Sequence, residues 1–508
     1  MVGAQLTHDA DVLLHLLAVL STTHLTGDVP AAGGDYQEVT FDVPAGTVEI
    51  QISHTDGSDA VILDWGVWSP DGFRGWGGGL VDDAVIGVAQ SSRGYLAGPL
   101  PVGTWRVVIG KAQVGTLGGQ YTIDVVCRDN ATLPVAPTAP HAAVVLSPER
   151  RWYQGDFHVH SEQSGDADAA LPAIAALARA RGLDFVTITD HNTSAQLPLL
   201  PALQATTSDV LLLRGAEITT YAGHANAVGT RAYIDHRIGV GGRAITGVLD
   251  DVVAQGGITI VNHPALDLGG ACIGCAWRHA DTDWSKVTGI EVLTGRWELT
   301  ERAFTPGAIA LWDAQEDAGH PLAAIGGSDD HRAGAGTGVT ESPLGSPTTM
   351  VLADGLSEAA ILDALRAHRT IVQLRGPDDP VVDVRIGDAT IGDTVAAVPA
   401  ATLDVHVTGG AGMFAQVWRD GAKVDQQEVT SDDATVSYTD TTAGAHRFRV
   451  ELIDAGNQRI VVTSHLYATI VPDADGCGCG ATGDAGGAGL LGVGVLALVG
   501  RRRARVRA

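Results

Sequence analysis

Short apolar runs alternate with longer amphipathic stretches between residues 150 and 376. Four of the runs have the length of buried β-strands, at residues 183–189, 210–215, 257–261 and 322–326. Helical periodicity separates them, for example at residues 169–181 and 246–255. Strands that alternate with helices pair in parallel through right-handed crossovers. The pattern therefore predicts an α/β domain in this part of the chain.

Side chains that bind metals recur where these runs end. An alternating run at residues 155–160 ends in His158 and His160, which share one face of a strand. The later runs are followed by Asp190 and His191, by Glu217 and His224, by Asn262 and His263, and by Asp329, Asp330 and His331. The carboxyl ends of the strands meet on one face of a (β/α) barrel, so we expect these residues to form a metal site.

Five segments resemble the ordered motifs of a known superfamily. They are "GDFHVHSEQSGD", "LDFVTITDHN", "RGAEITTYAGHANAVG", "TIVNHP" and "GGSDDH". As a set they are similar to the PHP (polymerase and histidinol phosphatase) superfamily of metal-dependent hydrolases. The lead-in "WYQGDFHVHS", and the "CIGCAW" that follows "NHP", resemble its CehA/McbA-type, carbaryl-hydrolase-like branch. The resemblance implies a distorted (β/α)7 PHP barrel at residues 150–376 with two or three divalent metal ions.

The resemblance also implies a ligand set for each ion. One ion would be held by His158, His160, Glu217 and Asp329, a second by Glu217, His224 and His263, and a third by Asp166, His191 and His331. Glu217 would bridge the first two ions, and Glu217, Asp329 and His331 are the expected catalytic residues. Mixed nitrogen and oxygen ligands suit Zn, Mn or Fe. Two neighbouring ions can share a bridging hydroxide and polarise the scissile group.

Three carboxylates of this region have alternative interpretations. Asp166 is interpreted as a metal ligand, although many members of the superfamily carry this acid one residue earlier. It could instead cap the helix that begins near Ala169, a role for which Asp168 competes. Asp190 and Asp330 stand beside ligands, and they are expected to orient an imidazole or to transfer a proton.

Two cysteines and two arginines lie near the predicted site. Cys272 and Cys275 form a C-x-x-C pair shortly after His263. A zinc site would need two more close ligands, so we expect a disulfide in an exported protein and free thiols in a cytosolic one. Arg296 and Arg332 are candidates for bidentate binding of a substrate phosphate or carboxylate, with ordinary surface arginines as the alternative.

Period-2 alternation with Gly, Pro and Asp turns flanks the α/β region on both sides. Residues 31–130 and 377–471 are therefore expected to form β-sandwich domains, and residues 131–149 a linker rich in Pro and Ala. Trp65, Trp68 and Trp76 could form a carbohydrate platform, although packing is the favoured interpretation.

The two ends of the chain give conflicting indications about export. Residues 1–30 are ambiguous, because the apolar stretch at 12–20 follows no Lys or Arg and is a poor signal peptide. Residues 472–508 combine a Gly-rich spacer containing Cys477 and Cys479, a short apolar run and an Arg cluster. This tail resembles the MYXO-CTERM sorting signal, which implies attachment to the cell surface or outer membrane. A plain membrane anchor is the alternative.

Length and composition narrow the range of possible functions. The chain has 508 residues, a net charge of −27 and five cysteines. Its length allows several domains, and the acidic charge disfavours nucleic acid as a stable partner. We expect a metal-dependent hydrolase that uses a metal-activated water to cleave a small-molecule phosphoester or other ester bond. The alternatives are a carbamate or carboxyl esterase and a non-catalytic surface protein that binds metal or glycan.

Overall fold

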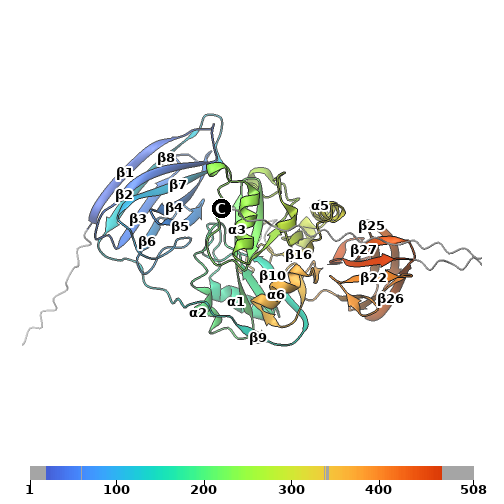
Figure 1. The fold of residues 1–508 in the computed structure, drawn as a ribbon. Coiled ribbons are helices and arrows are strands. Elements are labelled where there is room, and N and C mark those ends of the chain that lie inside the picture. Colours follow the sequence, from blue (N-terminus) through green and yellow to red (C-terminus); the bar gives the residue numbers. More distant parts are fainter. Residues whose placement is uncertain (1–18, 59, 337, 339–341, 472–508) are drawn as a thin grey trace, which may run out of the picture.

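The computed structural model describes residues 19–58, 60–336, 338 and 342–471. An N-terminal β domain, a central α/β domain and a C-terminal β region follow one another along the molecule (Figure 1). The fold is mixed α/β, strand-rich and poor in helices. The α-helices are α1 (Leu171–Ala180), α2 (Leu200–Gln204), α3 (Ile245–Ala254), α4 (Trp297–Thr300), α5 (Thr305–Asp317) and α6 (Glu358–Arg366).

Two four-stranded antiparallel sheets build the N-terminal domain around a shared core. Their strand orders are β1-β8-β3-β6 and β2-β7-β4-β5. The strands are β1 (Val19–Val29), β2 (Tyr36–Val43), β3 (Glu49–Thr55), β4 (Ile62–Ser69), β5 (Gly72–Gly78), β6 (Ala84–Gly87), β7 (Gly103–Gln113) and β8 (Gly119–Arg128). Alternate residues of β7, including Trp105, Val107 and Ile109, point into the core from one sheet, and Ile123 and Val125 of β8 do so from the other.

Strand β1 lies in the segment for which the sequence predicted no element. It pairs with β8 along its length, from Val19 to Val29. β1 is an edge strand whose residues are mostly exposed or half-buried, so it contributes few side chains to the core. A strand of this kind carries little apolar periodicity, which explains why the pattern missed it. The predicted linker likewise contains a short strand, β9 (Val145–Ser147), which pairs with β18 (Leu356–Ser357).

One continuous sheet runs through the central domain in the order β16-β15-β14-β13-β12-β11-β10-β17-β19. Its strands are β10 (Arg151–Val159), β11 (Phe185–Ile188), β12 (Leu211–Thr220), β13 (Gly223–Val228), β14 (Ile258–Val261), β15 (Gly289–Thr294), β16 (Ala323–Gly327), β17 (Thr348–Ala353) and β19 (Thr370–Gln373). The pairs β10–β11, β11–β12, β14–β15 and β15–β16 are parallel. Apolar residues of α1, β11 and β12, such as Ile174, Val186 and Leu212, pack together on one side of this sheet.

The prediction of uniform strand–helix alternation is wrong at β12 and β13. These strands are antiparallel, and β13 is also antiparallel to β14. Only Tyr221 and Ala222 separate β12 from β13, and a parallel crossover needs a dozen or more residues. Glu217 therefore lies within β12 rather than beyond its end, and His224 lies opposite Thr219 in the hairpin.

The C-terminal region continues the central sheet. β19 pairs with β28, and the sheet extends from there through β27, β24 and β25, with β29 and β22 attached. A separate sheet has the order β21-β20-β23-β26. The strands are β20 (Val381–Ile386), β21 (Ala389–Thr390), β22 (Thr394–Val398), β23 (Ala401–Thr408), β24 (Phe414–Arg419), β25 (Ala422–Glu428), β26 (Asp433–Asp440), β27 (Gly444–Ile453), β28 (Arg459–Thr463) and β29 (Leu466–Ile470).

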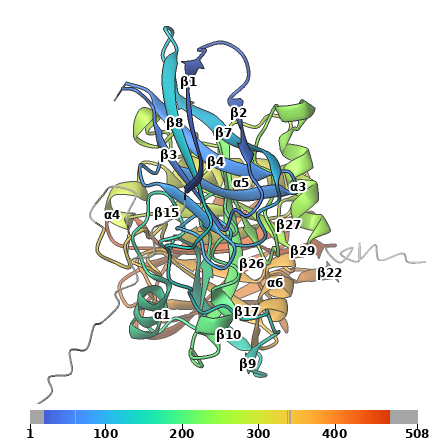
Figure 2. The same cartoon turned by 90° about the vertical axis from the view of Figure 1, so that its left-hand side faces the viewer.

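The N-terminal domain packs directly on the central domain, in front of it in the view of Figure 2. The Tyr221 hydroxyl donates to Asp64 Oδ2 at 2.7 Å. The Thr193 hydroxyl donates to the Gly94 carbonyl at 2.8 Å. A Cβ at Gly165 would lie 2.2 Å from the Gly77 carbonyl oxygen, so the two backbones approach closely. The domains therefore share a polar and tightly packed interface.

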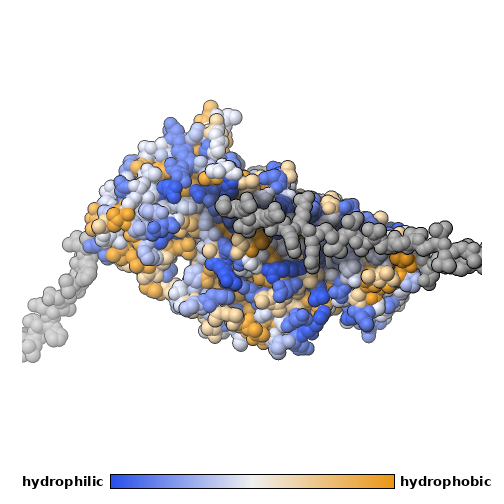
Figure 3. All heavy atoms as spheres, viewed as in Figure 1, coloured by the Kyte–Doolittle hydropathy of each residue, from blue (hydrophilic) through white to orange (hydrophobic). Residues whose placement is uncertain are grey.

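Polar and apolar residues are intermixed on the face of the molecule shown in Figure 3. Within residues 19–471, apart from the short gaps in the described chain, no helix is both long and apolar enough to cross a membrane. The predicted sorting tail at 472–508 lies outside the described residues, as does the first part of the ambiguous segment 1–30.

Candidate metal centre

The nine predicted metal ligands converge at one place in the central domain. They come from β10 and the loop after it, from the segment after β11, from the β12–β13 hairpin, and from the ends of β14 and β16. The nine are His158, His160, Asp166, His191, Glu217, His224, His263, Asp329 and His331. Residues 173 positions apart in the sequence, from 158 to 331, thus share one site.

Glu217 lies at the middle of this cluster. Its Oε1 is 3.4 Å from His158 Nε2, 3.4 Å from His224 Nδ1 and 3.4 Å from His263 Nε2. Its Oε2 is 2.6 Å from His191 Nδ1 and 3.7 Å from His160 Nε2. The two carboxylate oxygens therefore face different histidines: Oε1 faces His158, His224 and His263, and Oε2 faces His191 and His160.

Asp329 and Asp166 complete the carboxylates of the cluster. Asp329 Oδ1 lies 3.2 Å from His158 Nε2 and 3.1 Å from His160 Nε2. Asp166 Oδ2 lies 3.3 Å from His191 Nε2 and 3.4 Å from His331 Nε2. Helix α1 begins at Leu171 after Ala170 and has no side-chain cap, so Asp166 does not take the alternative role of an N-cap.

Each histidine has a partner for its other ring nitrogen, and sequence reasoning missed most of these partners. Those partners are Glu291 for His158 (2.9 Å), Ser164 for His160 (3.2 Å), Thr219 for His191 (2.6 Å), the Ile273 carbonyl for His224 (3.1 Å), the Cys275 carbonyl for His263 (3.1 Å) and the Asp329 carbonyl for His331 (2.7 Å). Such contacts fix the orientation and tautomer of a ligating imidazole.

Glu291 and Asn262 are the clearest additions to the predicted site. Glu291 is buried in β15, where one oxygen contacts His158 and the other accepts from the His263 backbone N–H at 2.8 Å. Asn262 donates to Glu217 Oε1 at 2.8 Å and so orients the Glu217 carboxylate. The available signal for Glu291 was an acid inside an otherwise apolar strand.

Within the described part of the chain, Asp190 and Asp330 bond to backbone and hydroxyl groups rather than to an imidazole, contrary to the expectation. Asp190 accepts from the Ser161 backbone N–H at 2.6 Å and from the Ser161 hydroxyl at 2.8 Å. Asp330 accepts from the N–H groups of Arg332, Gly334 and Leu344. Both carboxylates hold the backbone of the loops that carry ligands, because these loops leave N–H groups without strand partners.

The charges in the cluster suit cation binding. Burial opposes the ionisation of Glu217, but His191 and His158 hold its pKa well below the usual range. Burial, together with His331 and His191, lowers the pKa of His160 to about 3, so its ring is neutral at pH 7. Burial opposes the charge on His158, yet Asp329 and Glu291 raise its pKa well above the ordinary value. The ionised carboxylates are therefore stabilised by nearby positive charge, which a proton or a metal ion can supply.

The geometry of the donor atoms fits metal ions. The Nε2 atoms of His158 and His160 are buried and have no hydrogen-bond partner among the described residues. Within the described chain, four groups of donor atoms lie within 4.8 Å of one another: His160, His191 and His331; His158, His160 and Glu217; His158, His263 and Asp329; and His224, His263 and Cys275. A buried ring nitrogen without a hydrogen bond destabilises the folded state, and a cation bound between these nitrogens and the nearby carboxylates would remove that cost.

No family model matches this chain, and no curated protein matches it. Among solved structures, it is similar to a two-domain protein from Bacteroides vulgatus ATCC 8482 described as containing a predicted PHP-like metal-dependent phosphoesterase. That similarity has 20% identity, covers 65% of this chain and 100% of the other, and has a TM-score of 0.35. A β-glucuronidase from Bacteroides uniformis follows, with 9% identity, coverages of 86% and 74%, and a TM-score of 0.19. Both TM-scores are below 0.5.

The backbone is strained at two of the ligands. His263 has a φ of 26° and Asp329 a φ of 58°, a region that residues with a Cβ adopt at a cost. The Asp329 N–H donates to the His158 carbonyl at 2.9 Å, and the His160 N–H donates to the Asp330 carbonyl at 3.0 Å. These bonds hold the end of β16 against the end of β10. Strain of this kind, held by surrounding bonds, is typical of functional sites.

A pocket of about 620 Å³ opens over the cluster. Its floor includes Glu217, His224, His263, Asp329 and His331. Its walls come from the N-terminal domain (Ile62, Asp64, Trp76), from Tyr221, and from the loop that carries Cys272 and Ile273. The N-terminal domain thus forms part of the site, a contribution that the sequence did not predict.

The two predicted substrate arginines occupy different places. Arg332 lines the pocket, and its Nη1 lies 3.7 Å from Asp168 Oδ2. Arg296 is not among the described residues that line the pocket. Trp65, Trp68 and Trp76 are at most 5% exposed, so they pack inside the protein and form no exposed platform.

Proposed function

We propose that this chain is a metal-dependent hydrolase that cleaves an ester bond. The observation that carries the proposal is the convergence of six histidines and three carboxylates, with buried Nε2 atoms on His158 and His160 that face the carboxylates of Glu217 and Asp329, beneath a pocket large enough for a small molecule. Structural metal sites are closed, whereas catalytic sites keep an open position for water or substrate. The pocket therefore favours an enzyme over a non-catalytic metal-binding protein.

We also propose that the central domain is a distorted PHP-type (β/α)7 barrel of the CehA/McbA type. A parallel bridge between Val159 and Asp330 supports closure, since it joins the end of the last strand of the run, β16, to β10. The hydroxyls of Thr349 and Thr370 also bond to the backbone of β16, at 2.9 Å to Gly326 and 2.8 Å to Ala324. Side-chain bonds thus bring β16 beside β17 and β19.

The proposed catalytic residues are Glu217, Asp329 and His331. Divalent ions such as Zn, Mn or Fe, held by the nine ligands, would supply Lewis acidity that makes water a stronger nucleophile and polarises the bond to be cleaved. Glu217 and Asp329 hold negative charge at the floor of the pocket. His331 lies at the pocket with its Nδ1 fixed by the Asp329 carbonyl, so its Nε2 is available to bind an ion or to exchange a proton.

The pocket suggests the kind of substrate. Its floor would place cations beneath an anionic or carbonyl group, and Arg332 adds a cation at the wall. Phosphate is the group that this combination suits best. Ile62 and Ile273 also give the pocket apolar wall area, which favours an aryl or alkyl leaving group. An aryl carboxyl ester or carbamate is therefore the second candidate substrate.

A substrate panel tests the proposal. Purified protein loaded with Mn²⁺ or Zn²⁺ is assayed with p-nitrophenyl phosphate, bis-p-nitrophenyl phosphate, 1-naphthyl acetate and 1-naphthyl N-methylcarbamate. We expect hydrolysis of at least one substrate, with phosphoesters fastest, and none in the Glu217→Gln variant. Metal-loaded protein that hydrolyses none of the four classes would contradict the proposal.

We further propose that the protein is exported and attached to the cell surface through residues 472–508. The C-x-x-C disulfide supports an oxidising location. A sorting signal is removed, whereas an anchor is retained, so the surface-attached form is expected to lack residues 501–508. Peptide mass spectrometry of surface protein decides between them, because recovery of the intact C-terminal peptides would contradict the sorting signal.

A further inference from the structure

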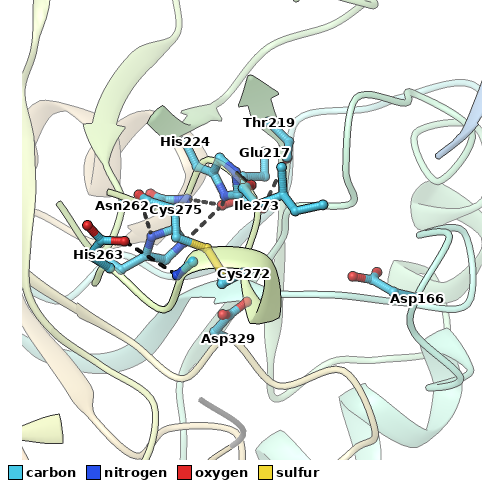
Figure 4. The surroundings of a disulfide bond; sticks show 12 residues. Asp166, Glu217, Thr219, His224, Asn262, His263, Cys272, Ile273, Cys275 and Asp329 are labelled. Atoms are coloured by element: carbon cyan, nitrogen blue, oxygen red, sulfur yellow. Dashed lines mark hydrogen bonds and ion pairs between the residues drawn. A yellow bond between two sulfur atoms is a disulfide. The ribbon is translucent and has the colours of Figure 1, made fainter. Parts of the chain in front are cut away.

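A disulfide-closed loop lies against two of the metal ligands. Cys272 and Cys275 are joined, with their Cα atoms 5.6 Å apart, and the loop covers His224 and His263 (Figure 4). The Ile273 carbonyl accepts from His224 Nε2 at 3.1 Å, and the Cys275 carbonyl accepts from His263 Nδ1 at 3.1 Å. These bonds leave His224 Nδ1 and His263 Nε2, which face Glu217, as the ligating nitrogens.

The loop is also fixed to the β12–β13 hairpin. Gly274 has a φ of +77°, and a Cβ at this position would lie 2.3 Å from the Thr220 carbonyl oxygen. The Arg278 N–H donates to the Ala222 carbonyl at 2.7 Å, and the Trp277 N–H donates to the Pro264 carbonyl at 3.0 Å. The loop therefore contacts the segments that carry both histidines, and only glycine fits where it touches the hairpin.

We propose that Cys272, Cys275 and Gly274 are positioning residues for the ion that Glu217, His224 and His263 would share. This inference rests on the metal centre of the proposed function. The disulfide closes the loop that presents the Ile273 and Cys275 carbonyl groups, each 3.1 Å from the imidazole that it orients. Contacts of this kind change metal affinity by about 10–100-fold when they are lost. One ion should depend on the loop, whereas the ions at His158, His160 and Asp329 and at Asp166, His191 and His331 should not.

The test breaks the disulfide by substitution rather than by chemical reduction. A free thiolate at Cys275 would itself reach His224 and His263, because its Sγ lies within 4.8 Å of their donor atoms. The double variant Cys272→Ser/Cys275→Ser breaks the disulfide without creating that thiolate. Gly274→Ala displaces the loop while the disulfide remains. Gly269→Ala is the matched control, since Gly269 also has a positive φ, +58°, but its Cβ would meet nothing within 4 Å.

The measurement is a calorimetric titration of Mn²⁺ into chelator-stripped protein, with metal analysis after dialysis. In the serine double variant and in Gly274→Ala, we expect one ion to bind about 10–100-fold more weakly, with the other ions unchanged. Gly269→Ala should match the wild type. If both loop variants bind every ion with wild-type affinity, the proposed role of the loop is wrong, whereas the proposed metal centre still stands. A wild-type protein that binds no ion would overturn the metal centre, and the inference with it.

Discussion

At the scale of the residue, Glu217 makes the largest number of contacts to ligand histidines. Glu217→Gln keeps the shape of the side chain but removes one anionic oxygen between those rings. We expect it to lower metal content by at least one ion per chain and to abolish hydrolysis, without unfolding the protein. Metal analysis, circular dichroism and the ester assay measure the three effects. Glu298→Gln, at an exposed position of α4, is the matched control and should change none of them.

Glu291 offers a second test at this scale, because it contacts His158 and the His263 backbone without facing the pocket. Glu291→Ala leaves His158 Nδ1 and the His263 N–H without acceptors. We expect metal affinity to fall about 10–100-fold, with Glu291→Gln less affected since its amide oxygen can still accept one bond. Calorimetry with Mn²⁺ measures this. Equal affinity in the alanine variant and the wild type would show that Glu291 does not orient His158.

The residues that converge as candidate ligands could be picked out from the sequence, whereas the residues that orient them could not. His158, His191, His263 and His331 follow apolar runs, so a local pattern marks them. The partner of each outer ring nitrogen is instead a hydroxyl, a carboxylate or a carbonyl that only the tertiary structure brings close. Asp190 and Asp330 illustrate the limit, because proximity in sequence suggested a role that the backbone N–H groups take instead.

At the scale of the element, the β12–β13 hairpin links the metal centre to the N-terminal domain. Tyr221, at its turn, donates to the half-buried Asp64 of β4 and stacks on Tyr36 with the ring centroids 5.9 Å apart. The sequence predicted a strand here but not the hairpin, since apolar periodicity does not distinguish a parallel strand from an antiparallel one. The two-residue turn between β12 and β13 is what excludes a parallel crossover.

Tyr221→Phe tests this link. Burial raises the pKa of Asp64 to about 6, and the Tyr221 hydrogen bond opposes that rise. Above pH 6 the carboxyl is ionised and depends on its donor, so we expect the variant to lose about 1–3 kcal/mol at pH 8 and less at pH 5. The sign follows because the hydrogen bond stabilises the ionised carboxylate: without it the pKa of Asp64 rises further, and the variant loses additional stability as pH rises through 6 and the carboxyl ionises.

Urea unfolding of chelator-stripped protein at the two pH values measures the difference. Tyr438→Phe is the control, because the hydroxyl of the half-buried Tyr438, in the C-terminal region, donates to Asp440 at 3.2 Å. A Tyr221→Phe loss that is the same at pH 5 and pH 8 would contradict the assigned role of Asp64.

At the scale of the whole molecule, the sequence predicted a mixed α/β centre between β-rich flanks, because period-2 and period-3.6 segments are separated along the chain. It did not predict that the N-terminal domain forms a wall of the pocket. That arrangement depends on contacts such as Tyr221 with Asp64 and Thr193 with Gly94, which are 157 and 99 residues apart. Long-range polar pairs of this kind leave no periodic signal.

Metal removal should destabilise the whole protein. Ions that bind only the folded state add free energy as RT ln(1 + [L]/Kd), about 2.7 kcal/mol at one hundred times Kd. We therefore expect chelation to lower the thermal midpoint and restored Mn²⁺ to raise it in proportion to the logarithm of its concentration. Monovalent salt at equal ionic strength is the control. A midpoint that does not respond to chelation would argue against a cluster that is filled in the native protein.

The central claim, an ester hydrolase that depends on this cluster, is tested most directly by following bound metal and hydrolysis in one titration. Chelator-stripped protein receives Mn²⁺ stepwise, and each step is analysed for ions per chain and for the rate with the best substrate of the panel. The account predicts that the rate rises with occupancy of the site and that Glu217→Gln stays inactive at every step. A rate that is independent of bound metal, or equal in Glu217→Gln and wild type, would contradict it.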